Sequence, residues 1–204
     1  MPSPSQRYPR FAERYDAGDV PWDHADPPPE VLELVPTLPA GRALDLGCGY
    51  GRAALFMARL GWTVDGVDFV ARAIEIARER AVVAGLAGRV QYHHGDVADL
   101  SFLTGTFDFA LDVGTFHSLD RGALEAYASG LARLLRPGAP YLVFVHLGPA
   151  APDETDGPPW VGEATLVDLF ADGFTLDHAE HGVTEIAGRP PRPSAWFWYR
   201  RALS

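Results

Sequence analysis

A glycine-rich turn at residues 47–51, with the sequence Gly-Cys-Gly-Tyr-Gly, has the residue types needed to hold a small ligand. An apolar run ends at this turn and a helical pattern begins directly after it. Glycine lets a ligand approach the backbone closely, and the N–H groups at a helix start attract polar groups. The next apolar run, residues 63–67, ends at Asp68. Because a carboxylate suits a sugar diol and repels phosphate, these features predict a nucleotide or nucleoside site.

The spacing of the turn separates it from two common phosphate-binding loops. A dinucleotide loop has the pattern G-x-G-x-x-G/A, whose last small residue lets the helix pack on the sheet. Arg52 stands at that position here, which disfavours a pyrophosphate site and a dehydrogenase. A Walker loop is excluded because no Gly-Lys-Ser/Thr follows the turn. The alternative that stays open is a tight strand-to-helix turn without a ligand.

Histidines supply the other candidate chemistry. His117 follows Gly114, just beyond a predicted strand, and an imidazole with an unperturbed pKa of about 6.5 can accept a proton at neutral pH. We consider His117 either as a general base or as a residue that positions the substrate. His146 ends a later predicted strand, where it could enter the same pocket or serve as a polar strand end.

The remaining histidines and the cysteine do not predict a metal site. His93 and His94 are consecutive in a predicted strand, so their side chains point to opposite faces. His178 and His181 lie in the predicted C-terminal hairpin without a carboxylate at a convincing ligand spacing. Cys48 is interpreted as a small buried side chain of the glycine turn. We therefore expect no metal.

The composition fits one α/β domain without a basic surface. The chain has 204 residues, 47% of them hydrophobic, which is enough for a sizeable core. Lys and Arg total 17 against 27 Asp and Glu, and the formal net charge of -10 disfavours nucleic acid and anionic membranes as partners. With one cysteine and no apolar run long enough to span a membrane, a cytoplasmic location is expected.

Hydrophobic periodicity predicts alternating strands and helices after a weakly periodic N-terminal arm. Strands are expected at residues 42–46, 63–67, 90–94, 107–113, 141–147, 174–181 and 195–199. Helices are expected at residues 30–35, 52–60, 70–84, 124–135 and 163–170. A short Gly/Pro-rich connector, residues 188–193, joins the last two strands and predicts an antiparallel hairpin.

This order of elements predicts an α/β fold with a single doubly wound, mostly parallel sheet and an antiparallel C-terminal hairpin. We expect one domain over residues 1–204. Its predicted parts are an N-terminal arm, a ligand-binding core, and a substrate-side loop with the hairpin, at residues 1–27, 40–147 and 148–204. Ligands of such sheets bind at the carboxyl ends of the strands, where the glycine turn, Asp68 and His117 are expected.

Four ordered motifs carry a family resemblance: Leu44-Asp-Leu-Gly-Cys-Gly-Tyr-Gly51, Val64-Asp-Gly-Val-Asp68, Gly95-Asp96 and Leu111-Asp-Val-Gly114. They resemble the motifs of class I S-adenosylmethionine-dependent methyltransferases over residues 40–147. The resemblance implies a Rossmann-like fold, a methyl-transferring enzyme, and S-adenosyl-L-methionine as the cofactor. The segments at residues 15–23 and at Phe116-His117 further resemble the thiopurine, halide/thiol and tellurite-resistance branch, whose N-terminal arm closes over the cofactor.

The resemblance also implies a role for each matched residue. The glycine turn would face the methionine part of the cofactor, Asp68 would accept hydrogen bonds from the ribose hydroxyls, and Phe69 or Val70 would pack on the adenine. Asp96 would accept from the adenine amino group beside the backbone donor of Val97. The expected cofactor-binding set is Tyr15, Trp22, Asp45, Gly47, Cys48, Gly49, Asp68, Phe69, Asp96, Val97 and Asp112.

Some of these residues keep a second interpretation. Asp45 would orient the glycine turn or meet the cofactor's ammonium, and it could equally satisfy N–H groups of the turn. Asp112 would meet the ammonium or lie in a surface loop. Tyr15 and Trp22 are candidate lid residues, because a π face attracts a sulfonium cation, and Trp22 could instead anchor the arm.

The implied reaction is direct in-line methyl transfer to a small-molecule acceptor, in which the protein positions the acceptor and excludes water. The leading hypothesis is a soft acceptor of thiol or halide type, which needs no base. The alternatives are an O- or N-methyltransferase of a small metabolite and a noncatalytic cofactor-binding protein. An aromatic acceptor pocket is expected from the loops at residues 115–120 and 148–160, with Trp22, Phe116, Trp160 and Trp196. The oligomeric state is not predicted.

Overall fold

Contacts within the chain divide it into two units, Met1–Val97 with Phe107–Phe109, and Ala98–Thr106 with Ala110–Ser204. The structure is a computed structural model in which residues 7–148, 161–185 and 190–203 are described. The single domain expected from the sequence, with its arm, core and C-terminal part, stays a prediction.

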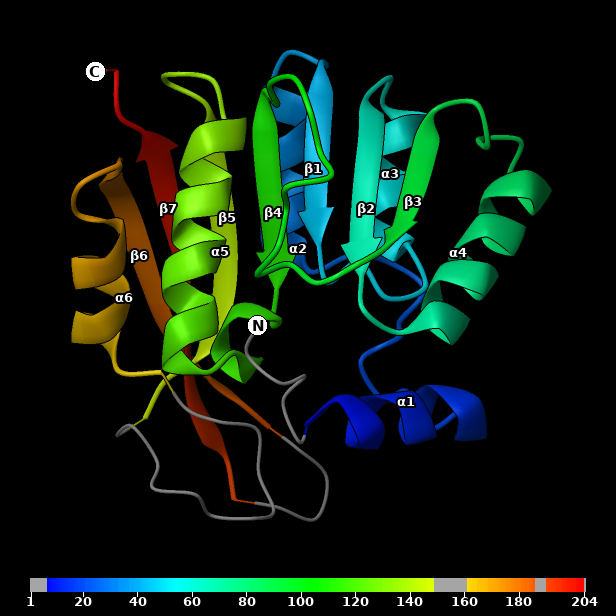
Figure 1. The fold of residues 1–204 in the computed structure, drawn as a ribbon, viewed down its shortest axis with the longest axis horizontal. Coiled ribbons are helices and arrows are strands. Elements are labelled where there is room, and N and C mark those ends of the chain that lie inside the picture. The colour runs from blue at the N-terminus through cyan, green and yellow to red at the C-terminus, as the bar shows by residue number, and fades with distance from the viewer. Residues whose placement is uncertain (1–6, 149–160, 186–189, 204) are drawn as a thin grey trace. The chain divides into compact units, whose positions relative to one another are not determined.

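Three parallel strands form the sheet of the first unit (Figure 1). They are β1 (Arg42–Leu46), β2 (Thr63–Asp68) and β3 (Val90–His94), in the order β3-β2-β1. β1 is apolar except at Arg42 and Asp45, as expected for a strand whose two faces are both covered. The predicted bounds of β1 and β3 are confirmed, and β2 extends one residue further, to include Asp68.

Helices of the first unit follow the predicted pattern with one exception. They are α1 (Arg7–Ala17), α2 (Pro29–Leu34), α3 (Arg52–Arg59) and α4 (Ala71–Val83), with a 3-10 turn, η1 (Val35–Thr37). Pro29 begins α2, a position where a helix tolerates proline. The predicted apolar stripe on α4 is confirmed, since Ile74, Ala77 and Ala81 are buried.

Helix α1 corrects the expectation of a weakly periodic arm. Phe11, Ala12 and Tyr15 have helical spacing, and Pro9 lies in the first turn of the helix, where its missing N–H costs little. The face that carries Phe11 and Tyr15 packs against Ala73 of α4 and its neighbours. The periodicity was therefore present in the sequence, but it spans few residues and its packing partners are distant along the chain.

The second unit holds the strand order β4-β5-β7-β6. Its strands are β4 (Phe109–Val113), β5 (Pro140–His146), β6 (Phe174–Thr184) and β7 (Arg192–Arg201), and its helices are η2 (Phe116–Ser118), α5 (Arg121–Leu134) and α6 (Glu163–Phe170). β4 and β5 are parallel, and β7 runs antiparallel to both β5 and β6, which confirms the predicted hairpin. No helix among the described residues is long and apolar enough to cross a membrane.

The hairpin strands are longer than predicted because their pairing continues toward the connector. β6 reaches Thr184, which pairs with Arg192 at the start of β7. The predicted connector at residues 188–193 therefore includes the first residues of β7, and residues 186–189 lie outside the described part. β4 is shorter than predicted and begins at Phe109. β5 lies between β4 and β7, in agreement with its uniformly apolar sequence.

Aromatic side chains fill the core of the second unit. Tyr141 of β5, Tyr199 of β7 and Phe170 of α6 are buried, with ring centroids 5.0–6.2 Å apart. Phe116 of η2 joins this core, 5.4 Å from the ring of Tyr127. Phe116 is fully buried, and its place in an acceptor pocket stays a prediction.

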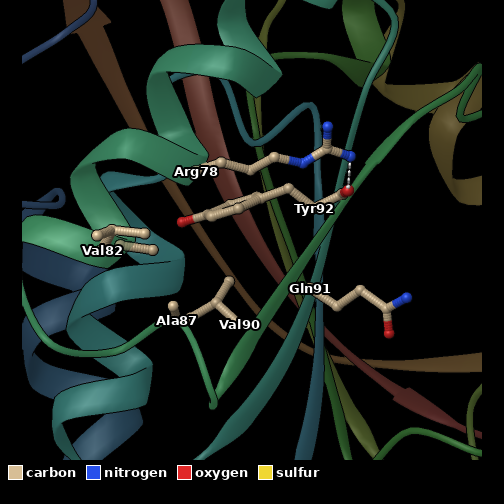
Figure 2. Close-up of a pocket in the computed structure, with 7 residues that line it drawn as sticks. Arg78, Val82, Ala87, Val90, Gln91 and Tyr92 are labelled. Atoms are coloured by element: carbon tan, nitrogen blue, oxygen red, sulfur yellow. Dashed lines mark hydrogen bonds between the residues drawn. The ribbon is translucent and has the colours of Figure 1, made fainter.

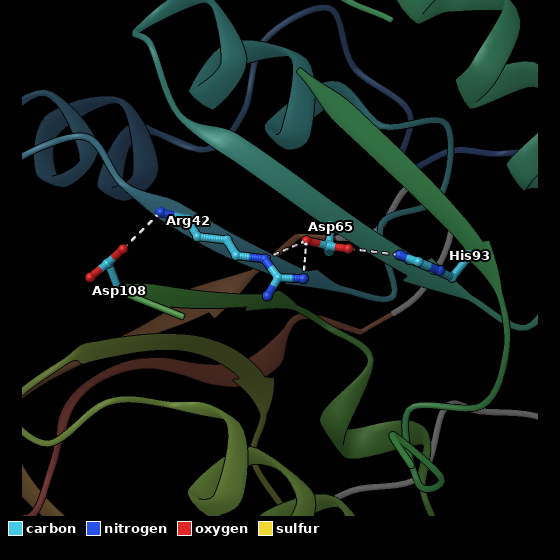
Figure 3. Close-up of polar contacts among 4 residues, drawn as sticks. All are labelled: Arg42, Asp65, His93 and Asp108. Atoms are coloured by element: carbon cyan, nitrogen blue, oxygen red, sulfur yellow. Dashed lines mark hydrogen bonds and ion pairs between the residues drawn. The ribbon is translucent and has the colours of Figure 1, made fainter. Parts of the chain in front are cut away.

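A polar network crosses one face of the sheet in the first unit (Figure 3). Asp65 of β2 accepts a hydrogen bond from Arg42 Nε at 3.0 Å and pairs with His93 Nε2 at 2.8 Å. The backbone N–H of Arg42 donates to Asp108 at 2.8 Å, and its guanidinium lies 4.1 Å from the ring centre of Phe107. Burial raises the pKa of Asp65, but the hydrogen bonds and charges of His93 and Arg42 outweigh it and leave the pKa below its ordinary value.

Replacing Asp65 by Asn should lower the free energy of unfolding by about 1–3 kcal/mol at pH 7, because Arg42 keeps its charge and loses its carboxylate partner. A depressed pKa stabilises the fold above the unfolded pKa, and this contribution is lost as the pH falls through the folded pKa, below about pH 4. Urea unfolding at pH 7 and pH 3 measures both values.

The control for Asp65→Asn is Glu75→Gln, which removes the exposed partner of Arg72 on α4. We expect it to change the free energy of unfolding by less than about 0.5 kcal/mol, as is typical of exposed ion pairs. A loss in Asp65→Asn that is as large at pH 3 as at pH 7 would contradict the network's electrostatic role.

Candidate functional site

The glycine turn joins β1 to α3, as the sequence predicts. The N–H groups of Gly47 and Cys48 both donate to the Val67 carbonyl, at 2.8 and 3.0 Å. Gly51 has a φ of 80°, and a Cβ there would collide with the hydroxyl of Tyr92. Glycine is therefore required at residue 51 by the protein's own packing, independently of any ligand.

Asp68 fastens this turn to the end of β2. Its Oδ2 accepts a hydrogen bond from the Gly49 N–H at 2.9 Å, and its Oδ1 accepts one from the Val70 N–H at 2.9 Å. The side chain is 5% exposed. Burial raises the pKa of Asp68 to about 6, although the N–H groups of Val70 and Gly49 pull it down. Each carboxylate oxygen has a second lone pair, so Asp68 can hold the turn and still accept from a ligand.

Tyr15 of α1 covers the glycine turn. An ideal Cβ on Gly49 would lie 2.9 Å from the Tyr15 hydroxyl, so the phenol stands directly over this residue. Trp22 Nε1 donates to the same hydroxyl at 3.0 Å. Tyr15 also packs edge-on against Tyr50, with ring centroids 5.1 Å apart. Burial, followed by the charge of Asp68, raises the pKa of Tyr15, so the phenol stays neutral at physiological pH.

An ion pair holds the segment after α1 in place. Arg80 of α4 donates to both oxygens of Asp23, at 3.0 and 2.7 Å. The Arg80 guanidinium lies 4.7 Å from the ring centre of Tyr50. Sequence reasoning missed Asp23, Tyr50 and Arg80, because nothing in a local pattern links residues that lie so far apart in the chain.

The other predicted residues of the first unit lie as follows. Asp45 and Cys48 are both buried. Burial, followed by the charges of Asp45 and Asp68, raises the pKa of Cys48, so the thiol stays protonated. This confirms Cys48 as a small buried side chain. The Gly95 N–H donates to the backbone carbonyl of Asp68 at 3.0 Å, which brings the following Asp96 close to the end of β2. Asp96 is exposed, Val97 is buried, and Phe69 is half-buried beside Phe11.

A separate hollow lies between α4 and β3 (Figure 2). Its volume is about 270 Å³, and its lining residues are Arg78, Ala81, Val82, Ala87, Val90, Gln91 and Tyr92. The Arg78 guanidinium donates to the Tyr92 carbonyl at 2.6 Å, so its charged group is bound to β3, the edge strand of the sheet. No set of polar side chains converges on this hollow, and we assign it no ligand.

Asp112 of the second unit is fully buried, which excludes its interpretation as a surface-loop carboxylate. Its Oδ1 accepts from the Thr115 N–H at 2.7 Å, and its Oδ2 accepts from the Tyr127 hydroxyl at 2.9 Å. Tyr127 in turn contacts the Tyr141 hydroxyl at 2.8 Å. Burial raises the pKa of Asp112 to about 7, against the lowering effect of Thr115 and Tyr127. Asp112 thus organises the turn that leads to η2.

His117 lies on η2 and is buried against His146. Its Nδ1 accepts a hydrogen bond from the backbone N–H of His146 at 3.3 Å, and the two rings lie 4.7 Å apart. In a neutral imidazole the other nitrogen then carries the proton. Nε2 of His117 is therefore a donor, which favours positioning over general-base catalysis.

His93, His94, His178 and His181 each have a carboxylate or carbonyl partner. His178 pairs with Glu180 and His181 with Glu163, both at 3.0 Å, and each is a single pair. His94 bonds to a backbone carbonyl. Within residues 7–148, 161–185 and 190–203, no three His, Cys, Asp or Glu side chains gather as metal ligands. Trp160, predicted to line the acceptor pocket, lies outside the described residues.

The first unit thus has the arrangement expected of an α/β protein that binds a nucleoside-containing ligand: a strand, a glycine turn, a helix, and an acid at the next strand end. Residues 43–138 match a family model described as a methyltransferase domain. The chain is 34% identical over 162 residues to 2-heptyl-1-hydroxyquinolin-4(1H)-one methyltransferase of Mycobacteroides abscessus, covering 79% of this chain and 71% of that protein. The chain therefore belongs to the S-adenosylmethionine-dependent methyltransferase family.

A second relative and two solved structures agree with this assignment. The chain is 35% identical over 103 residues to a fatty-acid O-methyltransferase of Mycolicibacterium smegmatis, covering 50% of this chain and 35% of that protein. A structure described under conversion of a disulfide bond into a thioacetal group during echinomycin biosynthesis superimposes with a TM-score of 0.80 and 26% identity, covering 98% and 93% of the two chains. The N-methyltransferase NodS of Bradyrhizobium japonicum, solved with S-adenosyl-L-homocysteine, gives a TM-score of 0.75 and 19% identity, covering 94% and 97%.

These similarities confirm the predicted fold class, a mostly parallel Rossmann-like sheet with an antiparallel C-terminal hairpin. They also confirm the enzyme class and the cofactor predicted from the sequence. The protein is a methyltransferase that uses S-adenosylmethionine to methylate a small molecule. The roles of individual residues in the site stay predictions.

The burial of Asp112 predicts an unusual pH dependence of stability. Because its pKa of about 7 exceeds that of an unfolded carboxyl, the folded state binds the proton more tightly, and stability falls as the pH rises from about 4 to about 7. Asp112→Asn does not titrate, so its stability relative to wild type should rise over this range, by at most about 1.4 kcal/mol per pH unit. Urea unfolding at several pH values measures this slope. Parallel profiles for the two proteins would contradict it.

Proposed function

We propose that the glycine turn and the end of β2 form the cofactor site. Gly47, Cys48 and Gly49 face the methionine part of S-adenosylmethionine, and Asp68 accepts hydrogen bonds from the two ribose hydroxyls. The other proposed contacts are Asp45 with the turn or the ammonium, Phe69 with the adenine face, Asp96 and Val97 with the adenine edge, and Asp112 with the ammonium. S-adenosylmethionine supplies a methyl group that is already activated as part of a sulfonium.

The observation that carries this proposal is the fixed orientation of the Asp68 carboxylate. Two backbone N–H groups hold its oxygens at 2.9 Å, so the side chain cannot rotate without breaking both bonds. An acceptor held in one orientation loses little entropy when two neighbouring hydroxyls bind to it. The residues present therefore fit the sugar of the cofactor.

Tyr15 and Trp22 are proposed as the lid of this site. The Tyr15 hydroxyl stands over Gly49 and accepts a hydrogen bond from Trp22 at 3.0 Å. An aromatic face at this place would attract a sulfonium in a desolvated pocket. Two arginines hold the chain next to these rings. Arg14 lies 5.1 Å from the Trp22 ring centre, and Arg80 forms an ion pair with Asp23, which follows Trp22. The closed lid would also exclude water from the reacting methyl group.

For the acceptor we propose a small planar molecule that is methylated on oxygen. The name of the 34% identical relative gives a hydroxyquinolinone as its substrate, which favours the O-methyltransferase alternative over the thiol or halide acceptor. A sulfur acceptor is the second candidate, because the 26% identical structure is described under a reaction that starts from a disulfide. The net charge of -10 and the single cysteine support a cytoplasmic enzyme without a nucleic-acid partner.

Titration with S-adenosyl-L-homocysteine tests the cofactor site. Because ribose hydroxyls donate to an ionised carboxylate, the Kd should rise as the pH falls below about 6, approaching tenfold per pH unit. Asp68→Asn should bind about 1–3 kcal/mol more weakly and show no such pH dependence. Calorimetry between pH 5.5 and 8 measures both, with NAD at matched concentration as the ligand control.

Two results would remove Asp68 from the cofactor site. One is a Kd of the wild-type protein that does not change with pH, and the other is undiminished affinity in Asp68→Asn. If NAD bound in place of S-adenosyl-L-homocysteine, the cofactor assignment itself would be wrong.

Two substitutions of His117 separate a positioning role from a base. His117→Gln can place an amide N–H donor near the position of Nε2, so it should keep turnover within about tenfold of wild type, whereas His117→Phe should lose about 100-fold or more. Production of S-adenosyl-L-homocysteine with a phenol acceptor measures both rates. If Gln and Phe lose equally, and more with weakly acidic phenols than with thiolates, His117 acts as the base.

A further inference from the structure

β7 of the C-terminal hairpin lies beside β5 (Figure 1) and pairs with it as far as the last residue of β5. Polar residues gather at this end of the pairing. His146 is the last residue of β5 and pairs with Ser194 of β7. Arg192, two residues before Ser194, begins β7 and pairs with Thr184 of β6. Side chains of paired residues, and of residues two apart on a strand, share one face of a sheet. Arg192, Ser194 and His146 therefore lie on the same face.

The arginine of this cluster is buried. Arg192 is 8% exposed and Ser194 is 5% exposed. The Thr184 hydroxyl donates to the Ser194 hydroxyl at 3.0 Å, which leaves the Ser194 hydroxyl hydrogen to point elsewhere. A guanidinium does not lose its proton in a protein, so burial places a permanent positive charge and several N–H donors here.

His146 packs against His117 of η2. Its ring lies 4.7 Å from the His117 ring and 5.3 Å from the Phe144 ring. Its Nδ1 is buried and has no hydrogen-bond partner among the described residues. Burial, followed by the charge of Arg192, lowers the pKa of His146, so the ring is neutral at pH 7. A neutral imidazole with a lone pair thus lies beside a fixed cation.

We propose that Arg192, Ser194 and His146 form the subsite for the acceptor's reacting oxygen, which is an acidic hydroxyl that reacts as an oxyanion. This inference rests on the proposed function, and it names the acceptor class. Arg192 supplies the counter-charge, and the Ser194 hydroxyl supplies a hydrogen-bond donor. Oxygen anions accept short, strong hydrogen bonds from such donors, as seen in guanidinium–carboxylate pairs. A halide or thiolate would gain less from them.

The proton and the electrons balance in this arrangement. The acidic O–H gives its proton to the free nitrogen of His146, which later releases it to solvent. The oxyanion forms the new O–C bond while the methyl C–S bond breaks and its electron pair stays on sulfur. The products are an O-methyl compound and S-adenosyl-L-homocysteine. An acceptor that is already ionised at the working pH needs Arg192 but not the proton transfer to His146.

The aromatic neighbours fit a ring that carries this oxygen. Phe144 precedes His146 by two residues on β5 and so shares its face, and it pairs with Trp196 of β7. The two rings lie 5.1 Å apart. An aromatic pair beside the His146 imidazole suits a planar molecule whose anionic oxygen reaches the subsite while its ring contacts the aromatic side chains.

Kinetics with three acceptors of matched ring size test the proposal. The acceptors are 1-hydroxyquinolin-4(1H)-one, quinolin-4-ylmethanol, whose hydroxyl is not acidic, and quinoline-4-thiol, and release of S-adenosyl-L-homocysteine reports turnover. Arg192→Gln should raise the KM for the N-hydroxy acceptor at least tenfold and leave the Kd of S-adenosyl-L-homocysteine within twofold. Arg192→Lys should recover part of the loss. Arg200→Gln, an exposed residue of β7 paired with Asp177, is the control and should leave the KM unchanged.

His146→Gln gives a second test that does not depend on the folding of an Arg192 variant. Its kcat should fall at least tenfold with 2-naphthol, a weak acid, and less than threefold with 1-hydroxyquinolin-4(1H)-one, a stronger one. Equal losses with both acceptors would remove the proton-accepting role. An unchanged KM in Arg192→Gln, or a wild-type preference for the thiol over the N-hydroxy acceptor, would overturn the oxyanion subsite. Failure of the wild-type protein to bind S-adenosyl-L-homocysteine would instead overturn the proposed function.

Discussion

The geometry of the glycine turn depends on one buried carboxylate, Asp68. Asp68 holds the N–H of Gly49 with one oxygen and the N–H of Val70 with the other, so a single side chain connects the glycine turn, the end of β2 and the start of α4. Removing a carboxylate from water is costly, and the two N–H bonds offset part of that cost. The remainder raises the pKa of Asp68 to about 6. The same burial that orients this acceptor therefore brings its titration close to physiological pH.

Two different constraints can require glycine in this turn: packing within the protein and close approach of a ligand. Tyr92 excludes a side chain at Gly51, and Tyr15 stands over Gly49, so packing within the protein already requires small residues at both positions. A glycine pattern alone thus cannot distinguish a cofactor site from a tight turn, which is why that alternative stayed open in the sequence. The acid at the end of β2 and the family similarity favour the cofactor site, which stays a proposal.

The sequence was most informative where a structural element depends on its own residues. The bounds of β1, β3 and α6 follow from short apolar runs and turn residues, and the structure confirms them. Features that depend on distant residues could not be found in this way. The helical face of α1 becomes meaningful only when it packs on α4, and the ion pair between Asp23 and Arg80 joins residues with no shared local pattern. The comparisons established the enzyme class, and they leave the role of each site residue as a prediction.

The tautomer of His117 depends on the different lengths of β4 and β5. β4 ends at Val113, which pairs with Phe144, whereas β5 continues to His146. The N–H of Leu147 is used by β7, at 2.8 Å from the Pro193 carbonyl, and N–H groups along a strand alternate in direction. The His146 N–H therefore points to the side where β4 has ended, and it donates to His117 Nδ1 instead. The extra length of β5 thus converts His117 into a donor and leaves the proton-accepting nitrogen on His146.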